Sequence, residues 1–179
     1  MQKSNLLNFI SIIFLIFSFT FYQSLFADEE GVVIKVIDGD TIHLLTDKKD
    51  KIKVRLQFID APELKQPYGY QSKQILESII LNKRIFLKSH SKDRYKRILG
   101  VIFLHKEDIN LKLIKMGAAW HYKKYTADQP IDNFKAYSTS EFVARSNKRG
   151  LWSKNATAPW DWRKKNYFTD KPKGSLNQL

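Results

Sequence analysis

The chain has no cysteine in its 179 residues, so disulfides, thiolate metal ligands and a cysteine nucleophile are all excluded. A glycine-rich phosphate loop, a serine triad and an internal repeat are also missing from the sequence. Histidine is scarce, and its spacing is not that of metal ligands; the four residues are His43, His90, His105 and His121. What remains to be explained is a set of carboxylates and arginines.

Negative charge is also scarce. Asp and Glu number 18 against 31 Lys and Arg, which gives a formal net charge of +13 and a pI near 9.8. Such an excess attracts polyanions such as nucleic acid, anionic lipid or acidic glycan. The alternative is a basic protein adapted to its compartment. The length is that of one domain, which can bury enough apolar surface to fold alone.

A long apolar run occurs at the beginning of the chain, from Leu6 to Phe21. With Lys3 before it and acids after Ala27, residues 1–27 have the parts of a secretory signal, and we predict cleavage after Ala27. An uncleaved anchor is the alternative, because the run approaches the length that spans a bilayer. The first interpretation predicts export to the periplasm or the medium. The second predicts a membrane-anchored protein with an extracytoplasmic domain.

Residues 31–63 carry the alternation of apolar and polar residues that is typical of half-buried strands. We predict strands at 32–37, 41–45 and 51–59. Asp38-Gly39 predicts a tight turn between the first two, since glycine readily takes a positive φ. Pro62 ends the third strand, because proline cannot donate a hydrogen bond to a ladder.

Acids lie at the ends of these strands. Taken singly, Asp38 and Asp40 are turn residues and Asp60 caps a strand. Taken together, two carboxylates beside an irregular Ala-Pro turn offer the hard oxygen ligands that Ca²⁺ and Mg²⁺ prefer. Glu63 follows, where it can orient or deprotonate a water. Arg55 offers a planar fork that matches phosphate oxygens.

The remaining sequence predicts helices at 70–81, 109–116 (stopped by Gly117) and 132–148, the last capped by Asp132, with strands at 84–87 and 98–104. Residues 89–97 are too polar for a core. Arg94, Lys96 and Arg97 surround Tyr95 there, either as a phosphate- and base-binding patch or as a solvated hairpin loop. The aromatic residues of 118–125 either line a binding face or cover the core. From 153 the chain holds Trp160, Trp162 and Arg163, and then becomes polar and loose.

Five segments in this order resemble the staphylococcal nuclease-like family: VIDGDT, RLQFIDAPE, DRYKRILG, GAAW and RGLW. The resemblance covers residues 31–163. It implies an α+β fold with a mainly β core, in which an OB-type five-stranded barrel is flanked by about three helices. It also divides the chain into a leader (1–27), the nuclease-like domain (28–163) and a basic, polar tail (164–179).

The resemblance further implies Ca²⁺-dependent hydrolysis of DNA and RNA with little sequence specificity. It implies no protein partner, and we expect a monomer. The family's metal carboxylates fall on Asp40 and Asp60, and its metal-binding backbone carbonyl falls on Ala61, where the staphylococcal enzyme has threonine. Its catalytic glutamate falls on Glu63, and its two phosphate-binding arginines fall on Arg55 and Arg97. Lys96 stands where the family often has glycine. The alternative function is a non-catalytic OB module that binds single-stranded nucleic acid.

Overall fold

The computed structural model describes residues 28–125 and 128–169. The predicted leader at 1–27 lies outside these residues, as does the end of the predicted tail. Within the described ranges, no helix has the length and apolar character needed to cross a membrane.

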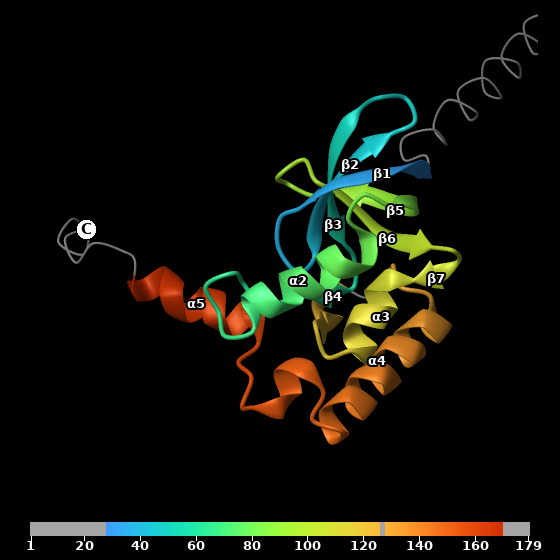
Figure 1. The fold of residues 1–179 in the computed structure, drawn as a ribbon. Coiled ribbons are helices and arrows are strands. Elements are labelled where there is room, and N and C mark those ends of the chain that lie inside the picture. The colour runs from blue at the N-terminus through green and yellow to red at the C-terminus, as the bar shows by residue number, and fades with distance from the viewer. Residues whose placement is uncertain (1–27, 126–127, 170–179) are drawn as a thin grey trace, which may run out of the picture.

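A closed barrel of five strands forms the centre of the molecule (Figure 1), as the family resemblance implied. Neighbouring strands follow the order β3-β2-β1-β5-β6, each pair antiparallel, and a parallel pairing of β3 with β6 closes the ring. The strands are β1 (Glu29–Val36), β2 (Thr41–Thr46), β3 (Lys51–Leu56), β5 (Arg84–Lys92) and β6 (Ile98–Leu104).

Alternation along the strands fills the barrel. Ile42, Leu44 and Val54 are fully buried at the inward positions that a period of two predicts. In β1 the register with β2 shifts after Val33, so that Val33 and Val36 are both buried although they are three positions apart. A packed barrel of this size is a rigid support for side chains carried at its strand ends.

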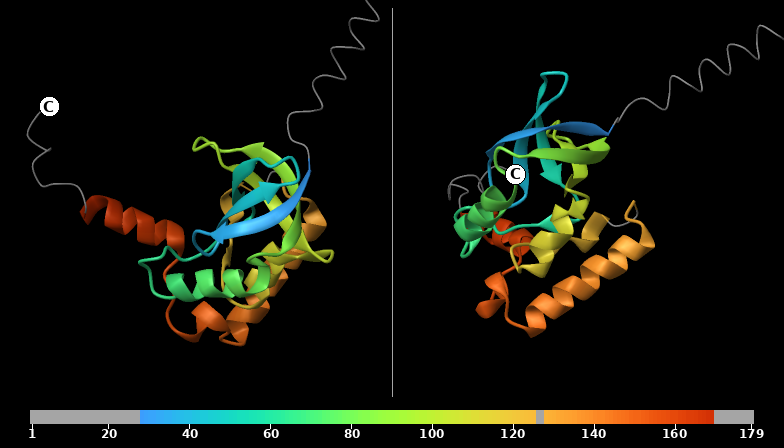
Figure 2. Two further views of the ribbon diagram at one scale, coloured as in Figure 1. Left: turned by 45° about the horizontal axis from the view of Figure 1, so that its top comes forward. Right: turned by 45° about the vertical axis from the view of Figure 1, so that its right-hand side comes forward.

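Helices cover one side and one end of the barrel (Figures 1 and 2). The resemblance implies about three, and the described residues contain a fourth, α5, whose second half lies in the tail that the sequence predicts to be loose. The reason is that α5 begins at Pro159, which suits a first helical turn, and Trp160 anchors it on an apolar cluster. The remaining elements are α2 (Gly69–Ile80), α3 (Ile109–Lys115), α4 (Ile131–Ser146), α5 (Pro159–Thr169), the short strands β4 (Ile59–Asp60), β7 (Glu107–Asp108) and β8 (Trp120–His121), and the 3₁₀ turns η1 (Lys123–Tyr125) and η2 (Gly150–Ser153).

The bounds of two predicted elements differ from those in the structure. The predicted strand 51–59 is broken, because Phe58 takes a positive φ of 64° and turns the chain before β4. The predicted polar loop at 89–97 is shorter, because β5 continues to Lys92 along β6 with a bulge between Ser89 and Ser91. Polar residues that pair with a neighbouring strand on an exposed edge need no apolar pattern.

Helix ends follow the predicted residues in part. Gly117 has a φ of 69° just after α3, the left-handed conformation that ends helices. Asp132 is not the cap of α4, since the helix begins at Ile131 after Pro130, and Asp132 instead lies in the first turn. Asp108 caps α3 by accepting a hydrogen bond from the Leu111 N–H.

Gly39 is required for a different reason from the one its sequence context suggested. Its φ is not positive; instead, a Cβ on Gly39 would lie 2.6 Å from Cβ of Ala61 and 2.8 Å from Cβ of Ser72. The turn between β1 and β2 therefore packs directly on the β4 end and on α2. This close approach brings Asp40 to Asp60.

Candidate active site

A cleft of about 890 Å³ opens at this end of the barrel and gathers all six residues singled out from the sequence. They are Asp40, Arg55, Asp60, Ala61, Glu63 and Arg97. The cleft is also lined by Asp38, Asp93, Arg94, Tyr95, Tyr122, Lys124 and Arg163, which sequence reasoning had left uncertain or had not assigned.

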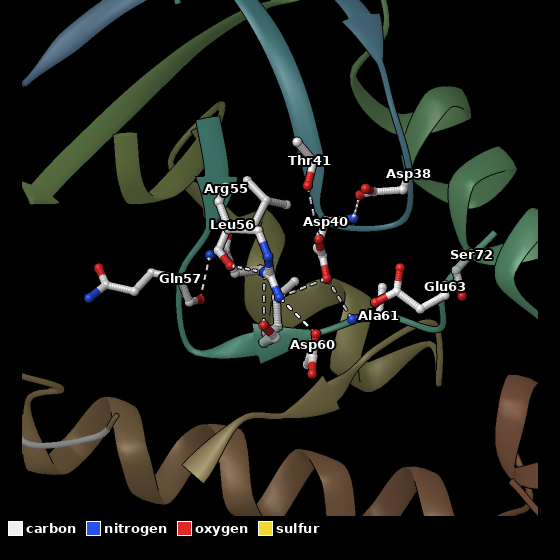
Figure 3. Close-up of polar contacts among 12 residues, drawn as sticks. Asp38, Asp40, Thr41, Arg55, Leu56, Gln57, Asp60, Ala61, Glu63 and Ser72 are labelled. Carbon is white, nitrogen blue, oxygen red and sulfur yellow. Dashed lines mark hydrogen bonds and ion pairs between the residues drawn. The ribbon is translucent and has the colours of Figure 1, made fainter. Parts of the chain in front are cut away.

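Asp40 is held at the start of β2 by the backbone and by its neighbours. Its Oδ2 accepts a hydrogen bond from the Ala61 N–H at 2.7 Å, and its Oδ1 accepts one from the Thr41 hydroxyl at 3.2 Å. The Asp38 side chain in turn accepts from the Asp40 N–H at 3.0 Å. These contacts fix the carboxylate against β4 (Figure 3).

Burial raises the pKa of Asp40 well above its ordinary value. The charge of Arg55 and the Ala61 N–H act in the opposite direction, whereas the nearby charges of Asp38 and Asp60 raise it further. Such a concentration of negative charge is stabilised by a cation.

Arg55 lies between the two aspartates (Figure 3). Its Nη2 is 2.8 Å from Oδ1 of Asp60 and 3.0 Å from Oδ2 of Asp40, while its Nη1 donates to the carbonyls of Leu56 at 2.6 Å and Ile59 at 2.9 Å. An arginine has five N–H donors, of which the terminal nitrogens carry four. The fork that the sequence suggested for phosphate is thus directed to two carboxylates and to the turn after β3.

Arg97 is differently placed. Its Nε donates to Oδ2 of Asp93 at 2.7 Å, and in the described part of the chain its two terminal nitrogens have no hydrogen-bond partner. The Arg97 guanidinium carbon lies 5.5 Å from the ring centre of Tyr95, which is 64% exposed. The fork of Arg97 therefore remains available at the cleft.

Asp93 organises the loop that carries Arg97. Its Oδ1 accepts from the N–H groups of Tyr95 and Arg97 at 2.9 and 3.0 Å. Partial burial raises the pKa of Asp93, but the hydrogen bonds and charge of Arg97 outweigh that effect and hold the pKa below its ordinary value. Lys96 has a φ of 62° in this loop, at the position where the family often has glycine. Arg94, Tyr95 and Arg97 line the cleft together, with Tyr95 exposed.

The aromatic residues of 118–125 take both roles that the sequence left open: they cover an apolar cluster and they line the cleft. Trp120 is 8% exposed and packs edge-on against Trp152 and Trp160, with ring centres 4.2 and 5.4 Å apart. Tyr122, two residues later, lines the cleft. Tyr122 follows the end of β8 and also contacts Trp160, with ring centres 5.5 Å apart, so the apolar cluster and the cleft adjoin each other.

Sequence reasoning did not assign Arg163 to the site. This residue of α5 forms ion pairs with Asp60 and with Glu63. The sequence offers little signal for it, because Arg163 is separated from both acids by about a hundred positions.

The cleft fits a hard divalent cation in its donor chemistry. Asp40 and Asp60 lie close enough to share one arginine nitrogen, and carboxylate and carbonyl oxygens are the ligands that Ca²⁺ and Mg²⁺ prefer. Among the described residues, no group of three or more His, Cys, Asp or Glu side chains is arranged as a metal site. A cation here would therefore depend on two carboxylates, a backbone oxygen and water or phosphate.

Comparison with known proteins agrees with this geometry. Residues 53–154 match the model of the staphylococcal nuclease homologue family. The chain belongs to the staphylococcal nuclease family. A protein of Haemophilus influenzae named as an uncharacterized endonuclease is 41% identical over 133 residues, covering 74% of this chain and 71% of that protein.

Two further relatives extend the likeness over most of the chain. An uncharacterized endonuclease of Escherichia coli is 36% identical over 157 residues, covering 87% of this chain and 96% of that protein. A micrococcal nuclease of Shigella flexneri is 36% identical over 148 residues, covering 77% of this chain and 82% of that protein. Membership of the family supports nuclease activity, that is, hydrolysis of nucleic acid.

Proposed function

We propose that this protein is a metal-dependent endonuclease that hydrolyses phosphodiester bonds in both DNA and RNA with little sequence specificity, and that its metal is Ca²⁺. One observation carries the proposal: a single cleft holds Asp40, Asp60 and Glu63 together with Arg97, whose fork is available. Acids beside an available guanidinium fork suit the hydrolysis of a phosphate ester.

We assign the metal to the carboxylates of Asp40 and Asp60 and to the backbone carbonyl of Ala61. When bound, it would supply Lewis-acid stabilisation of charge on a phosphate oxygen. Arg55 keeps the two carboxylates side by side, because one of its nitrogens contacts both.

Glu63 is assigned to the attacking water. Its side chain is 41% exposed and lines the cleft, so its carboxylate can accept a proton from water or orient the water by a hydrogen bond. Arg97 would bind a phosphate oxygen through its terminal N–H groups, and its charge would offset negative charge that develops as the bond breaks.

Substrate binding would rest on charge more than on base contacts. The formal net charge of +13 favours polyanions in general, and Arg94, Tyr95 and Lys124 line the cleft beside the proposed site. Phosphate contacts of this kind carry no sequence information, so binding should weaken steeply with salt.

The test is cleavage of supercoiled plasmid and of RNA by residues 28–179, with Ca²⁺ or with excess EGTA. We expect nicking and RNA degradation with Ca²⁺ and their loss in EGTA. An Asp60→Asn variant should be inactive, whereas Asp50→Asn, the same change in an exposed turn between β2 and β3, should behave as wild type. Undiminished cleavage in EGTA would contradict the Ca²⁺ assignment, and binding without cleavage would favour the non-catalytic OB module.

Export is proposed from the leader alone. Its support is the charged start, the apolar run and the small residue at Ala27. Cell fractionation should find a shortened chain outside the cytoplasm. A full-length chain in the membrane fraction would instead support an uncleaved anchor.

A further inference from the structure

Arg163 contacts two of the carboxylates in the cleft at once. Its Nη2 donates to Oδ2 of Asp60 at 2.7 Å, and its Nη1 lies 3.3 Å from Oδ1 of the same residue and 2.6 Å from Oε1 of Glu63. The two terminal nitrogens of Arg163 thus contact both oxygens of Asp60, the two-pronged pairing that a planar guanidinium group favours, and one of them also contacts Glu63. Residues 53–154 define the match to the family, so Arg163 lies beyond it.

Arg163 is the side chain that holds the Glu63 carboxylate. Within the residues that the structure covers, no other hydrogen bond or ion pair of that carboxylate is found. An exposed ion pair contributes little to stability, and the Arg163 side chain is 45% exposed. Asp60, however, is 2% exposed, so its pairing with Arg163 is not that of two solvated surface groups.

The helix that carries Arg163 is docked on the cleft by two independent contacts. Trp160 packs against Trp120 and Tyr122, with ring centres 5.4 and 5.5 Å apart. Gln66, 5% exposed, accepts from the Glu63 N–H at 3.1 Å and donates to the Thr157 carbonyl at 2.6 Å.

These contacts join α5 to the loop that bears Glu63. Figures 1 and 2 show α5 beside this loop between β4 and α2 in each view. The position of Arg163 is therefore fixed by packing and does not depend on its ion pairs alone.

Charge gives Arg163 a second effect. Its guanidinium contacts both oxygens of Asp60, the residue assigned above to the metal. A positive charge so close opposes a divalent cation at the same carboxylate. With Arg163 in place, a cation at Asp60 would thus be bound more weakly, while the contact with Glu63 restricts the direction of that carboxylate.

We propose that Arg163 is a third arginine of the active site, a positioning residue that orients Glu63 for the attacking water and sets the metal affinity by its contact with Asp60. The inference rests on the proposed function. It predicts opposite effects of removing Arg163: tighter binding of the metal and slower turnover. Simple damage to the fold would instead weaken both properties together.

The experiment uses the full-length chain and three variants. Arg163→Gln removes the charge and the fork, and Arg163→Lys keeps the charge but removes the fork. Lys165→Gln is the matched control, because it removes the same charge from an exposed position on the same helix. Calorimetric titration with Ca²⁺ alone gives the metal affinity, and plasmid nicking over a range of Ca²⁺ and DNA concentrations gives kcat and KM.

For Arg163→Gln we expect Ca²⁺ to bind about three- to tenfold more tightly, as removal of a half-exposed charge predicts. Its kcat at saturating Ca²⁺ should fall about tenfold or more, because Glu63 is no longer oriented. Arg163→Lys should keep the Ca²⁺ affinity within about twofold of wild type and lose part of kcat. Lys165→Gln should match wild type in both measurements.

Three results would overturn the inference while the proposed function stands. They are an Arg163→Gln variant equal to wild type, one whose Ca²⁺ affinity and kcat both fall, and a Lys165→Gln variant that reproduces its effects. A wild-type chain that neither binds Ca²⁺ nor cleaves nucleic acid would overturn the proposed function, and this inference with it.

Discussion

The two arginines that look equivalent in sequence should respond differently to the same substitution by lysine. Arg55 directs its terminal nitrogens to two aspartates and two backbone carbonyls, whereas the side chain of Arg97 forms one hydrogen bond, to Asp93, among the residues described. The side chain of Arg55 is 14% exposed and that of Arg97 is 26% exposed. Lysine keeps the charge but offers one nitrogen with three donors in place of the fork.

The magnitude for Arg55→Lys follows from its acceptors. A single ammonium group cannot reach two carboxylates and two carbonyls that surround a fork, so at least one charge-assisted hydrogen bond is lost. Such bonds contribute about 1.5–3 kcal/mol each, and we expect the free energy of unfolding to fall by about 3 kcal/mol. Arg97→Lys gives up a partly exposed contact and should cost less than about 1 kcal/mol.

Turnover should fall in both variants for different reasons. Arg97→Lys loses the two-pronged contact to phosphate, and we expect kcat to drop by about 100- to 1,000-fold, as for the loss of one preorganised donor. Arg55→Lys lowers kcat by releasing Asp40 and Asp60 from each other.

Urea denaturation measures the first property and plasmid nicking at saturating Ca²⁺ measures the second. A stability change requires a shifted midpoint with an unchanged slope. Equal losses of stability in the two variants would refute the distinction drawn between them. An Arg97→Lys enzyme with wild-type turnover would refute the phosphate role of Arg97.

Three other predictions follow from the same structure. Asp40→Ala should lose activity, and added Ca²⁺ should restore part of it. The defect of Glu63→Gln should lie in kcat, and added Ca²⁺ should not correct it. Nicking rates measured over a range of Ca²⁺ concentrations distinguish the two variants. Lys96→Gly should raise the free energy of unfolding by about 0.5–1 kcal/mol, because φ at this position is 62° and glycine adopts a positive φ without steric cost. Thermal melting measures this change, and a destabilised variant would contradict the prediction. Burial lowers the pKa of His121 from its ordinary value near 6.5, so the unfolded chain binds more protons, and stability should be lost as pH falls below that value. As the pH is lowered, the urea midpoint of the His121→Gln variant should therefore fall less steeply than that of wild type.

Local sequence patterns determined the first three strands of the barrel and the identity of the cleft's acids. The period of two in residues 31–59 encodes strands with one buried face, and the structure has β1, β2 and β3 there. The DGDT and DAPE segments place carboxylates at strand ends, where side chains leave the ladder and face a common opening. Such information is local, because it depends on neighbouring residues in the chain.

The tertiary structure alone decided how those groups are paired. Arg163 meets Asp60 across 103 positions of sequence, and no periodicity encodes that distance. Gly39 matters because the turn that holds it packs on Ala61, a contact between separate segments. The fork of Arg55 is directed inward because the chain turns at Phe58 and presents carbonyls to it. Hydrogen-bond partners depend on the path of the whole chain, and the sequence specifies that path only through the packed core.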